Sequence, residues 1–364
     1  MSNKNKIYNL NHFFNKDLNE PKNEKDYIKL SNFEKKKYNK LLAILTLKLN
    51  KIHKKNYNNN YWDKILGYFI LFHISACNRF FNSDITKNKF FSKKKIKILD
   101  KENFHIPENI RNYRNCFQHS NFGQQQLFSL IFNFFYRKKI FKNYFSNYIK
   151  KKNIKKYKKS FSFEFLYFRL FNFIFRKLKN RNFKILVTKC YWPQEEKQKI
   201  QFYYKGNLLC RDFFIPLKNS SINQNLRNKI SQTDFKIKKD RFDKFFLYTL
   251  KYCLPKSFLE EYEYREKFTI NYLNKHKNLK YIINENLDED TMLLIAQAKF
   301  RKIKSIHSEH NFLQHQFIGN IIDFISKKFD IFLTLGWSLK NKKFKSGGSL
   351  FKWIDKKKKQ KKKS

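Results

Sequence analysis

Residues 281–310 read YIINENLDEDTMLLIAQAKFRKIKSIHSEH, and this stretch decides the fold class. It begins with a short apolar run over 281–284, continues into a helical pattern over 289–300, and returns to an apolar run over 303–307. A strand, a helix and a second strand at this spacing indicate a βαβ unit with parallel strands. We therefore predict an α/β fold with a Rossmann-like parallel sheet.

The same pattern extends to both sides of this stretch. Apolar runs predict further strands over 184–188, 199–204 and 331–335, and a helical pattern over 317–328 precedes the last of them. Apolar residues at helical spacing predict a helix-rich first part and two further helices before the βαβ unit. These predicted helices are 32–53, 61–81, 124–147, 161–178, 241–252 and 257–274.

Changes in composition along the chain divide it into four segments. Residues 1–30 are polar and are expected to be flexible, and residues 31–180 form a helical, aromatic-rich region. Residues 181–350 carry the α/β pattern and the candidate site. Residues 351–364, which end in KKKKQKKKS, are expected to be disordered because like charges repel and nothing in this tail can be buried.

Two apolar runs were weighed as membrane segments. The run over 65–77 has 13 uncharged residues, which suits a buried helix better than a bilayer span. The run FSFEFLYFRLFNFIF over 161–175 lies next to Lys-rich sequence and would suit a helix lying on an anionic membrane surface. We favour an aromatic core helix for this second run.

The chain is strongly basic, with a formal net charge of +51. Such a charge attracts nucleic acid, anionic lipid or phosphorylated substrates. However, Lys greatly outnumbers Arg, and the abundant Lys, Asn, Phe, Ile and Tyr share A/T-rich codons. Arg is the better bidentate ligand for phosphate. We therefore favour base-composition drift in an AT-rich genome over a surface selected to bind polyanions.

A basic, non-enzymatic protein associated with RNA or the ribosome is the alternative to an enzyme. The net charge and the 19% aromatic content would permit base stacking between phosphate contacts. No RNP, KH or zinc-knuckle signature supports it. Walker A and GxGxxG phosphate loops are also absent.

Cysteine usage and the start of the sequence indicate the compartment. The five cysteines are scattered and form no CxxC pair, which is typical of reduced thiols. The sequence MSNKNKIYNLNHFF has no apolar core of a secretion signal. We expect a cytoplasmic protein, peripheral to the inner membrane face if it contacts lipid.

The candidate site lies where three predicted strands end. Ligands of parallel α/β sheets bind beyond the carboxyl ends of the strands. Acidic, histidine and aromatic residues follow these three ends, and imidazole and carboxylate exchange protons near neutral pH. The residues are Asp288, Glu289, Glu309, His310, Gly336 and Trp337.

Several of these residues have a structural alternative, and His310 suits a structural loop residue. Asp288 and Glu289 suit the cap of a helix, and Trp337 suits core packing. His307, His310 and His315 match no zinc-ligand spacing, so we expect no metal site. We predict that the strands near 281–284, 303–307 and 331–335 are parallel neighbours in one sheet. Asp288, His310 and Trp337 should then share one open sheet edge, with Trp337 exposed.

Several short motifs resemble those of a family of bacterial transferases associated with surface-polysaccharide synthesis. The family pattern has an LN-x-x-H, a YW-x-x-x-x-G and a DR near the N-terminus, and LP-x-x-FLE, DE, QHGG and D-x-x-x-TWGW later. The matching N-terminal residues here are Leu49, Asn50, His53, Tyr61, Trp62, Gly67, Asn78 and Arg79. The later matches are Leu254, Pro255, Phe258, Leu259, Glu260, Asp288, Glu289, Ala296, His310, Asp330, Thr334, Leu335, Gly336 and Trp337.

The resemblance implies the first half of a glycosyltransferase-B-like fold and a transferase acting on a glycan or a lipid-linked phosphorylated acceptor. It implies His310 as base or hydroxyl binder, Glu309 and Asp330 as supporting catalytic acids, and Trp337 as a sugar-stacking surface. The expected substrate-binding residues are Asp288, Glu289, Gly336 and Trp337.

The sequence also departs from the family pattern. The family's Gln-His-Gly-Gly is Glu309-His310-Asn311-Phe312 here, so two glycines that would allow close approach of a ligand are replaced. The sequence is expected to stop before the family's second, donor-binding half. We therefore expect no cofactor, a nucleotide-sugar donor only if another chain supplies that half, and otherwise an incomplete or inactive enzyme.

Overall fold

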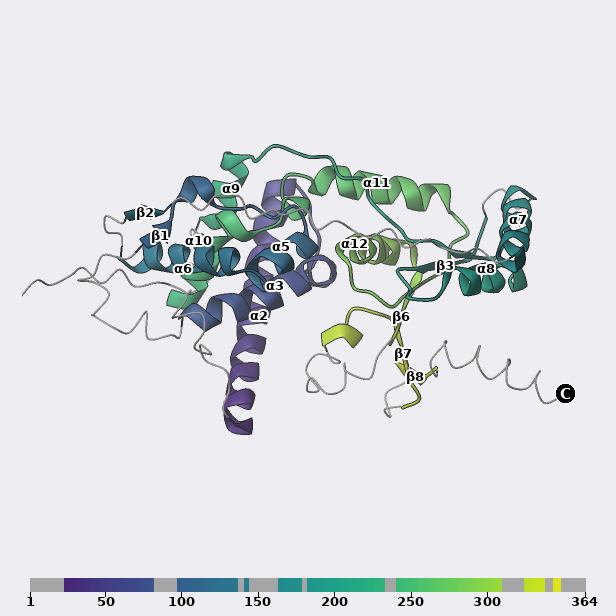
Figure 1. Ribbon diagram of the computed structural model, residues 1–364, viewed down its shortest axis with the longest axis horizontal. Coiled ribbons are helices and arrows are strands. Elements are labelled where there is room, and N and C mark those ends of the chain that lie inside the picture. The colour runs from purple at the N-terminus through teal and green to yellow at the C-terminus, as the bar shows by residue number, and fades with distance from the viewer. Residues whose placement is uncertain are drawn as a thin grey trace, which may run out of the picture. The chain divides into compact units, whose positions relative to one another are not determined.

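The computed structural model describes residues 23–81, 97–136, 141–143, 163–178, 182–232, 240–309, 324–337 and 343–347. The chain divides into two compact units (Figure 1). The helical unit comprises residues 1–153 and 218–263, and the sheet unit comprises residues 154–217 and 264–364. The predicted helix over 317–328 is described only from residue 324, and the lysine-rich tail lies outside the described residues.

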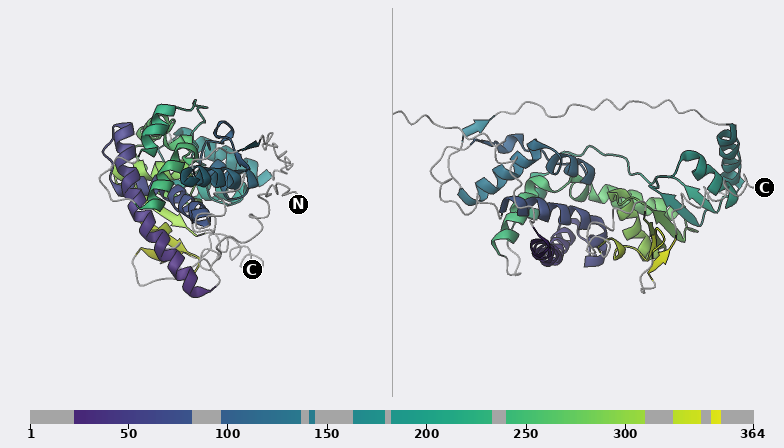
Figure 2. Two further views of the ribbon diagram at one scale, coloured as in Figure 1. Left: turned by 90° about the vertical axis from the view of Figure 1, so that its left-hand side faces the viewer. Right: turned by 60° about the horizontal axis from the view of Figure 1, so that its bottom comes forward.

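The sheet unit contains a six-stranded parallel sheet with the strand order β4-β3-β5-β6-β7-β8. Strands of this sheet are visible in teal to yellow in the right-hand view of Figure 2. Every neighbouring pair in it is parallel, which confirms the predicted Rossmann-like α/β class. The strands are β3 Ile185–Thr188, β4 Leu208–Cys210, β5 Tyr281–Asn284, β6 Lys304–Ser308, β7 Ile331–Thr334 and β8 Phe344–Ser346.

The register aligns the carboxyl ends of the central strands. Asn284 at the end of β5 is paired with His307 near the end of β6. Ser308 at the end of β6 is paired with Leu333 near the end of β7. The residues that follow β5, β6 and β7 therefore leave the sheet at the same edge, as the sequence predicted.

One predicted strand is wrong. Residues 199–203 belong to helix α8, Gln194–Tyr203, residue 204 is its C-cap, and the edge strand is instead β4. Two acidic residues in the first turn favour the helix, and Lys199 forms ion pairs with both Glu195 and Glu196 at helical spacing. Gln201, buried on the inner face of α8, accepts a hydrogen bond from the backbone N–H of Cys210 in β4 at 2.7 Å.

The other described helices of the sheet unit are α7 Phe163–Leu178, α11 Tyr262–Lys275 and α12 Glu289–Ala298. Helices α11 and α12 lie side by side (Figure 1). Arg265 on α11 forms buried ion pairs with Glu289 and Asp290 in the first turn of α12. Asp290 also accepts a hydrogen bond from the backbone N–H of Ile215. This network fixes the N-terminus of α12, which directly follows a site loop.

The helical unit is built mainly of α2 Glu24–His53, α3 Asn59–Phe81, α5 Ile110–Phe117, α6 Asn121–Tyr136, α9 Gln224–Ser231 and α10 Arg241–Cys253. A short parallel pair, β1 Lys97–Leu99 and β2 Phe141–Asn143, accompanies them. The helix predicted over 124–147 is too long, because α6 ends at Tyr136 and residues 141–143 form β2.

Local sequence explains where these helices begin. The Asn23 side chain accepts a hydrogen bond from the backbone N–H of Asp26 and caps α2, which therefore starts within the segment predicted to be flexible. Asp240 and Asp243 form a reciprocal capping box at the start of α10. Lys37 of α2 forms ion pairs with both carboxylates and so ties α2 to the start of α10.

Helix α3 shows why the uncharged run over 65–77 belongs to the core. Its buried residues lie on most of its circumference, and they include both apolar side chains and His73. Among the described helices, none combines the length and the apolar content that crossing a bilayer requires.

Candidate functional site

Two buried glutamates organise the carboxyl edge of the sheet. Glu285 is the first residue after β5, and Glu309 is the first residue after β6. Both side chains are buried, and each reaches across to the loop that follows a neighbouring strand. Hydrogen bonds to a buried carboxylate offset the cost of its burial, so these contacts fix both the acids and the loops.

Glu285 holds the loop that follows β3. One of its carboxylate oxygens accepts a hydrogen bond from the backbone N–H of Tyr191 at 2.8 Å. The other accepts from the indole N–H of Trp192, also at 2.8 Å. Glu285 is not among the residues predicted for the site, although it directly follows a predicted strand.

Glu309 holds the loop that follows β7 in the same way. Its Oε2 accepts from the backbone N–H of Leu335 at 3.0 Å and from the indole N–H of Trp337 at 2.8 Å. Between these donors lies Gly336, whose φ of 105° is a conformation that favours glycine. We call each such pairing of a glutamate with a backbone N–H and an indole N–H a carboxylate–indole clamp.

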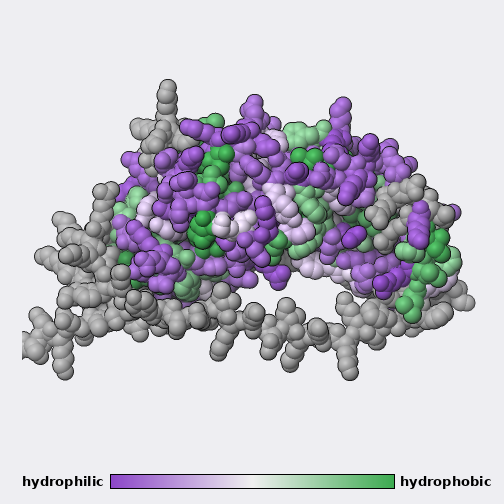
Figure 3. Space-filling view, turned by 90° about the horizontal axis from the view of Figure 1, so that it is seen from above, coloured by the Kyte–Doolittle hydropathy of each residue, from purple (hydrophilic) through white to green (hydrophobic). Residues whose placement is uncertain are grey.

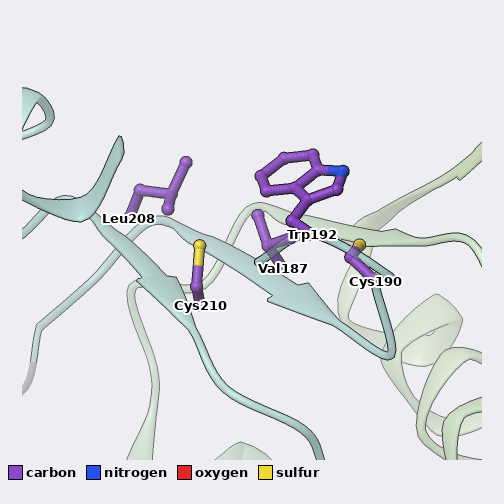
Figure 4. Close-up of a cluster of buried hydrophobic side chains, with 5 residues drawn as sticks. All are labelled: Val187, Cys190, Trp192, Leu208 and Cys210. Atoms are coloured by element: carbon purple, nitrogen blue, oxygen red, sulfur yellow. The ribbon is translucent and has the colours of Figure 1, made fainter. Parts of the chain in front are cut away.

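Trp192 is anchored on its apolar side as well. Its ring joins a buried cluster at the β3–β4 side of the sheet, in which the side chains point to one face (Figure 4). The other members of the cluster are Val187, Cys190, Leu208 and Cys210. Cys190 is buried in this cluster, and burial raises the pKa of its thiol.

Asp288 lies at the same edge and caps α12. One of its oxygens accepts from the backbone N–H groups of Asp290 and Thr291 at 3.1 and 3.2 Å, and the other accepts from the Thr291 hydroxyl. Burial raises the pKa of Asp288, although Lys189 and Thr291 act in the opposite direction. The structure therefore gives Asp288 the predicted capping role at a position that also borders the site.

The solvent-facing part of the edge is polar and aromatic. The Tyr191 ring is 56% exposed, and its hydroxyl accepts a hydrogen bond from the Asn286 side chain at 3.0 Å. Lys189, at a φ of 52°, places its ammonium group 5.9 Å from the centre of the Phe214 ring. An exposed ring, an amide and a cation are groups that suit a hydroxylated, phosphorylated ligand.

The structure does not bring every predicted residue to this edge. Asp330 precedes β7 and lies at the amino end of the sheet, where it accepts from the backbone N–H and the hydroxyl of Ser305 at 2.8 and 2.9 Å. The Glu289 side chain instead forms an ion pair with Arg265. Trp337 is half-buried, which corrects the expectation that it would be exposed. His310 lies outside the described residues.

No metal site is visible in the part of the chain that the structure describes, where no three His, Cys, Asp or Glu side chains gather suitably. His307, which precedes Glu309 by two residues, is buried in the core between the rings of Phe329 and Phe332.

The profile of the LIC12162 family transferases matches residues 4–364. The chain belongs to this transferase family. No curated protein and no solved structure matches it.

In this LIC12162 family member, the LN-x-x-H and YW-x-x-x-x-G motifs pack together where α2 is followed by α3 in the helical unit. Asn50 at the end of α2 accepts hydrogen bonds from the backbone N–H of Tyr57 at 3.1 Å and from the indole N–H of Trp62 at 2.9 Å. The His53 ring lies 4.4 Å from that of Tyr262 and contacts the carbonyl oxygen of Phe258 through Nε2 at 3.1 Å. These contacts fix the turn between α2 and α3.

The block LP-x-x-FLE of this family member is fixed by one arginine. Arg227 on α9 donates two hydrogen bonds to Glu260, at 2.7 and 2.6 Å, and a third to the carbonyl oxygen of Leu254 at 2.6 Å. All of these groups lie within the helical unit, and the Arg227 side chain is fully buried. Both blocks therefore have an architectural role, while the candidate site lies in the sheet unit.

Proposed function

We propose that the chain is a glycosyltransferase-like enzyme of surface-polysaccharide synthesis, with its reaction at the carboxyl edge of the parallel sheet. The observation that carries this proposal is the pair of carboxylate–indole clamps, which fix the loops after β3 and β7 at one edge. Loops fixed in this way can hold reacting groups in position, which contributes much of the rate of a transfer reaction. The transferase family of the chain agrees with this chemistry.

In such a transfer, a hydroxyl oxygen of the acceptor bonds to the anomeric carbon of the sugar donor. The bond from that carbon to the leaving phosphate oxygen breaks, and the acceptor proton passes to a base. We assign the base to His310, which directly follows Glu309 in the sequence, because imidazole accepts protons near neutral pH. Tyr191 and Asn286 would contact sugar hydroxyls, and Lys189 would face a phosphate group.

The acceptor we propose is a glycan or a lipid-linked phosphorylated sugar. A hydroxyl-rich ligand suits the exposed Tyr191 and Asn286, and a phosphate group suits Lys189. The alternative of a non-enzymatic RNA-binding protein gains no support from the family.

Replacing His310 by alanine is expected to lower the transfer rate on the order of a hundredfold, the usual contribution of a positioned base. The assay measures nucleotide release by the purified chain from a panel of nucleotide sugars, with a lipid-linked acceptor extract present. His276→Ala is the matched control, since His276 lies near the other end of the sheet unit's strands, beside Phe183 and Tyr272. Equal turnover of the wild type and His310→Ala would remove His310 from the mechanism.

A further inference from the structure

Helix α7 of the sheet unit has two different faces. Its inner face packs on α8, where the rings of Phe168 and Phe171 lie 5.3 and 5.9 Å from that of Phe202. On the same face, the Asn172 side chain donates to the carbonyl and side-chain oxygens of Gln198, at 2.9 and 2.7 Å. These contacts hold α7 firmly by one side.

The outer face of α7 is apolar and exposed. Leu170 is 59% exposed and Phe173 is 56% exposed, and they lie three residues apart on the helix. Figure 3 shows apolar residues gathering at the right-hand end of the view, over α7. The exposed large apolar side chains on this face are Leu166, Leu170, Phe173 and Ile174, and the 44% exposed Tyr167 lies at the border with the inner face, its ring 6.0 Å from that of Phe202. The interpretation of this run as an aromatic core helix is therefore wrong for its outer face.

The exposed large apolar side chains are concentrated on this one helix. Among the described residues, 14 large apolar side chains are exposed, and five of them fall within residues 166–174. Compositional drift would spread such residues over the whole surface, so it does not account for the concentration on one helix face. Single exposed apolar residues need no explanation, whereas a contiguous patch marks an interaction surface.

The charged residues near this helix in the sequence indicate its partner. Seven lysines occur in residues 150–159, directly before the helix in the sequence, and Arg176, Lys177, Lys179 and Arg181 occur at its end. Within the helix, Arg169 is exposed, and the Lys177 ammonium group lies 5.0 Å from the centre of the Phe173 ring. Basic residues on an apolar helix and next to it in the sequence are a pattern typical of binding to anionic lipid.

We propose that the outer face of α7 docks on an anionic bilayer surface, with the helix axis parallel to the membrane. Its 16 residues span about 24 Å, too short to cross a bilayer but long enough to lie in the interface. The lysine and arginine side chains would reach the lipid phosphates while the apolar side chains enter the headgroup boundary. This surface would bring the protein to a lipid-linked acceptor, but its test uses no substrate and does not depend on transferase activity.

The test is cosedimentation of the purified chain with vesicles of phosphatidylcholine and phosphatidylglycerol in equal amounts, compared with phosphatidylcholine alone. The double variant Leu170→Glu/Phe173→Glu is expected to lower the partition coefficient on the order of a hundredfold, because two buried apolar contacts are lost. The control is Leu217→Glu/Phe300→Glu, which makes the same charge change at two similarly exposed residues, 55% and 61%, of the same unit. It should bind within about twofold of the wild type.

Other outcomes would overturn the proposal. Equal losses in both double variants, or wild-type binding that disappears completely in high salt, would show adsorption by net charge alone. A wild-type dimer that the α7 variant dissociates, with lipid binding unchanged, would show that a second copy covers this face. Leu170→Ala/Phe173→Ala keeps the helix propensity and adds no charge, so its expected partial loss of binding tests the proposal if the glutamate variant fails to fold.

Discussion

Acidification is expected to destabilise the helical unit through His73, a fully buried histidine on α3. Its two ring nitrogens contact the hydroxyl groups of Tyr113 and Thr249 at 2.8 and 2.7 Å. Burial lowers the pKa of His73 from 6.5 to about 3. Below pH 6.5 His73 therefore binds a proton in the unfolded chain but stays neutral in the folded chain. The free energy of unfolding consequently decreases as the pH falls from 6.5 toward 3.

The expected loss of unfolding free energy is on the order of 4 kcal/mol across this window. Urea denaturation at a series of pH values measures it. Carboxylates also titrate at acidic pH, so the informative quantity is the difference in pH dependence between the wild type and His73→Gln, whose side chain does not titrate. His119→Gln replaces an exposed histidine of the same unit and serves as the control for the substitution itself. Identical curves for the wild type and His73→Gln would contradict this role of His73.

Replacing Arg227 by methionine is expected to lower the unfolding free energy by about 3–5 kcal/mol, the usual cost of leaving a buried charge without its partner. The side chains of Arg227 and Glu260 are 0% and 3% exposed, so water cannot replace the lost hydrogen bonds. The unfolding temperature should fall by roughly 10 °C. Thermal unfolding followed by circular dichroism measures this shift.

Two further variants separate the ion pair from general effects of losing an arginine. Arg111→Met removes an exposed arginine of the same unit and should change the unfolding free energy by less than about 0.5 kcal/mol. Arg227→Met/Glu260→Gln removes both charges and should be more stable than Arg227→Met alone. A loss below about 1 kcal/mol for Arg227→Met would mean that the ion pair is not needed to hold the LP-x-x-FLE block.

The sequence predicted the sheet well because buried parallel strands have a clear local pattern. Tyr281–Asn284 matches β5, and the predicted strand ends placed Asp288 and Trp337 at the same edge. Residues 199–204 show the limit of such a pattern, because a short mixed run suits either a strand or a helix. The first-turn acids and Lys199 favour the helix there, and those contacts depend on helical spacing.

The details of the site depend on contacts that local patterns do not contain. Glu285 is 93 residues from Trp192 in the sequence, and their hydrogen bond exists only because β3 and β5 are neighbours. Asp330 was predicted to be a supporting catalytic acid from its place in a family motif. Its position before β7 instead puts it at the amino end of the sheet, opposite the candidate site. For α7 the sequence left two interpretations open, since an amphipathic helix has the same periodicity whether the core or a membrane covers its apolar face, and the core helix was favoured.

The central claim is that the reaction takes place at the carboxyl edge of the sheet, and a matched pair of variants tests it most directly. Glu285→Gln and Asp330→Asn each neutralise a carboxylate that accepts two hydrogen bonds, the first at the carboxyl edge and the second at the amino edge of the same sheet. The transfer rate of each variant is measured beside the wild type, with thermal unfolding to show that both are folded. We predict a loss of about tenfold or more for Glu285→Gln, because the loop after β3 is released, and a change within about twofold for Asp330→Asn. A larger loss in Asp330→Asn than in Glu285→Gln would contradict the claim and place the reaction elsewhere.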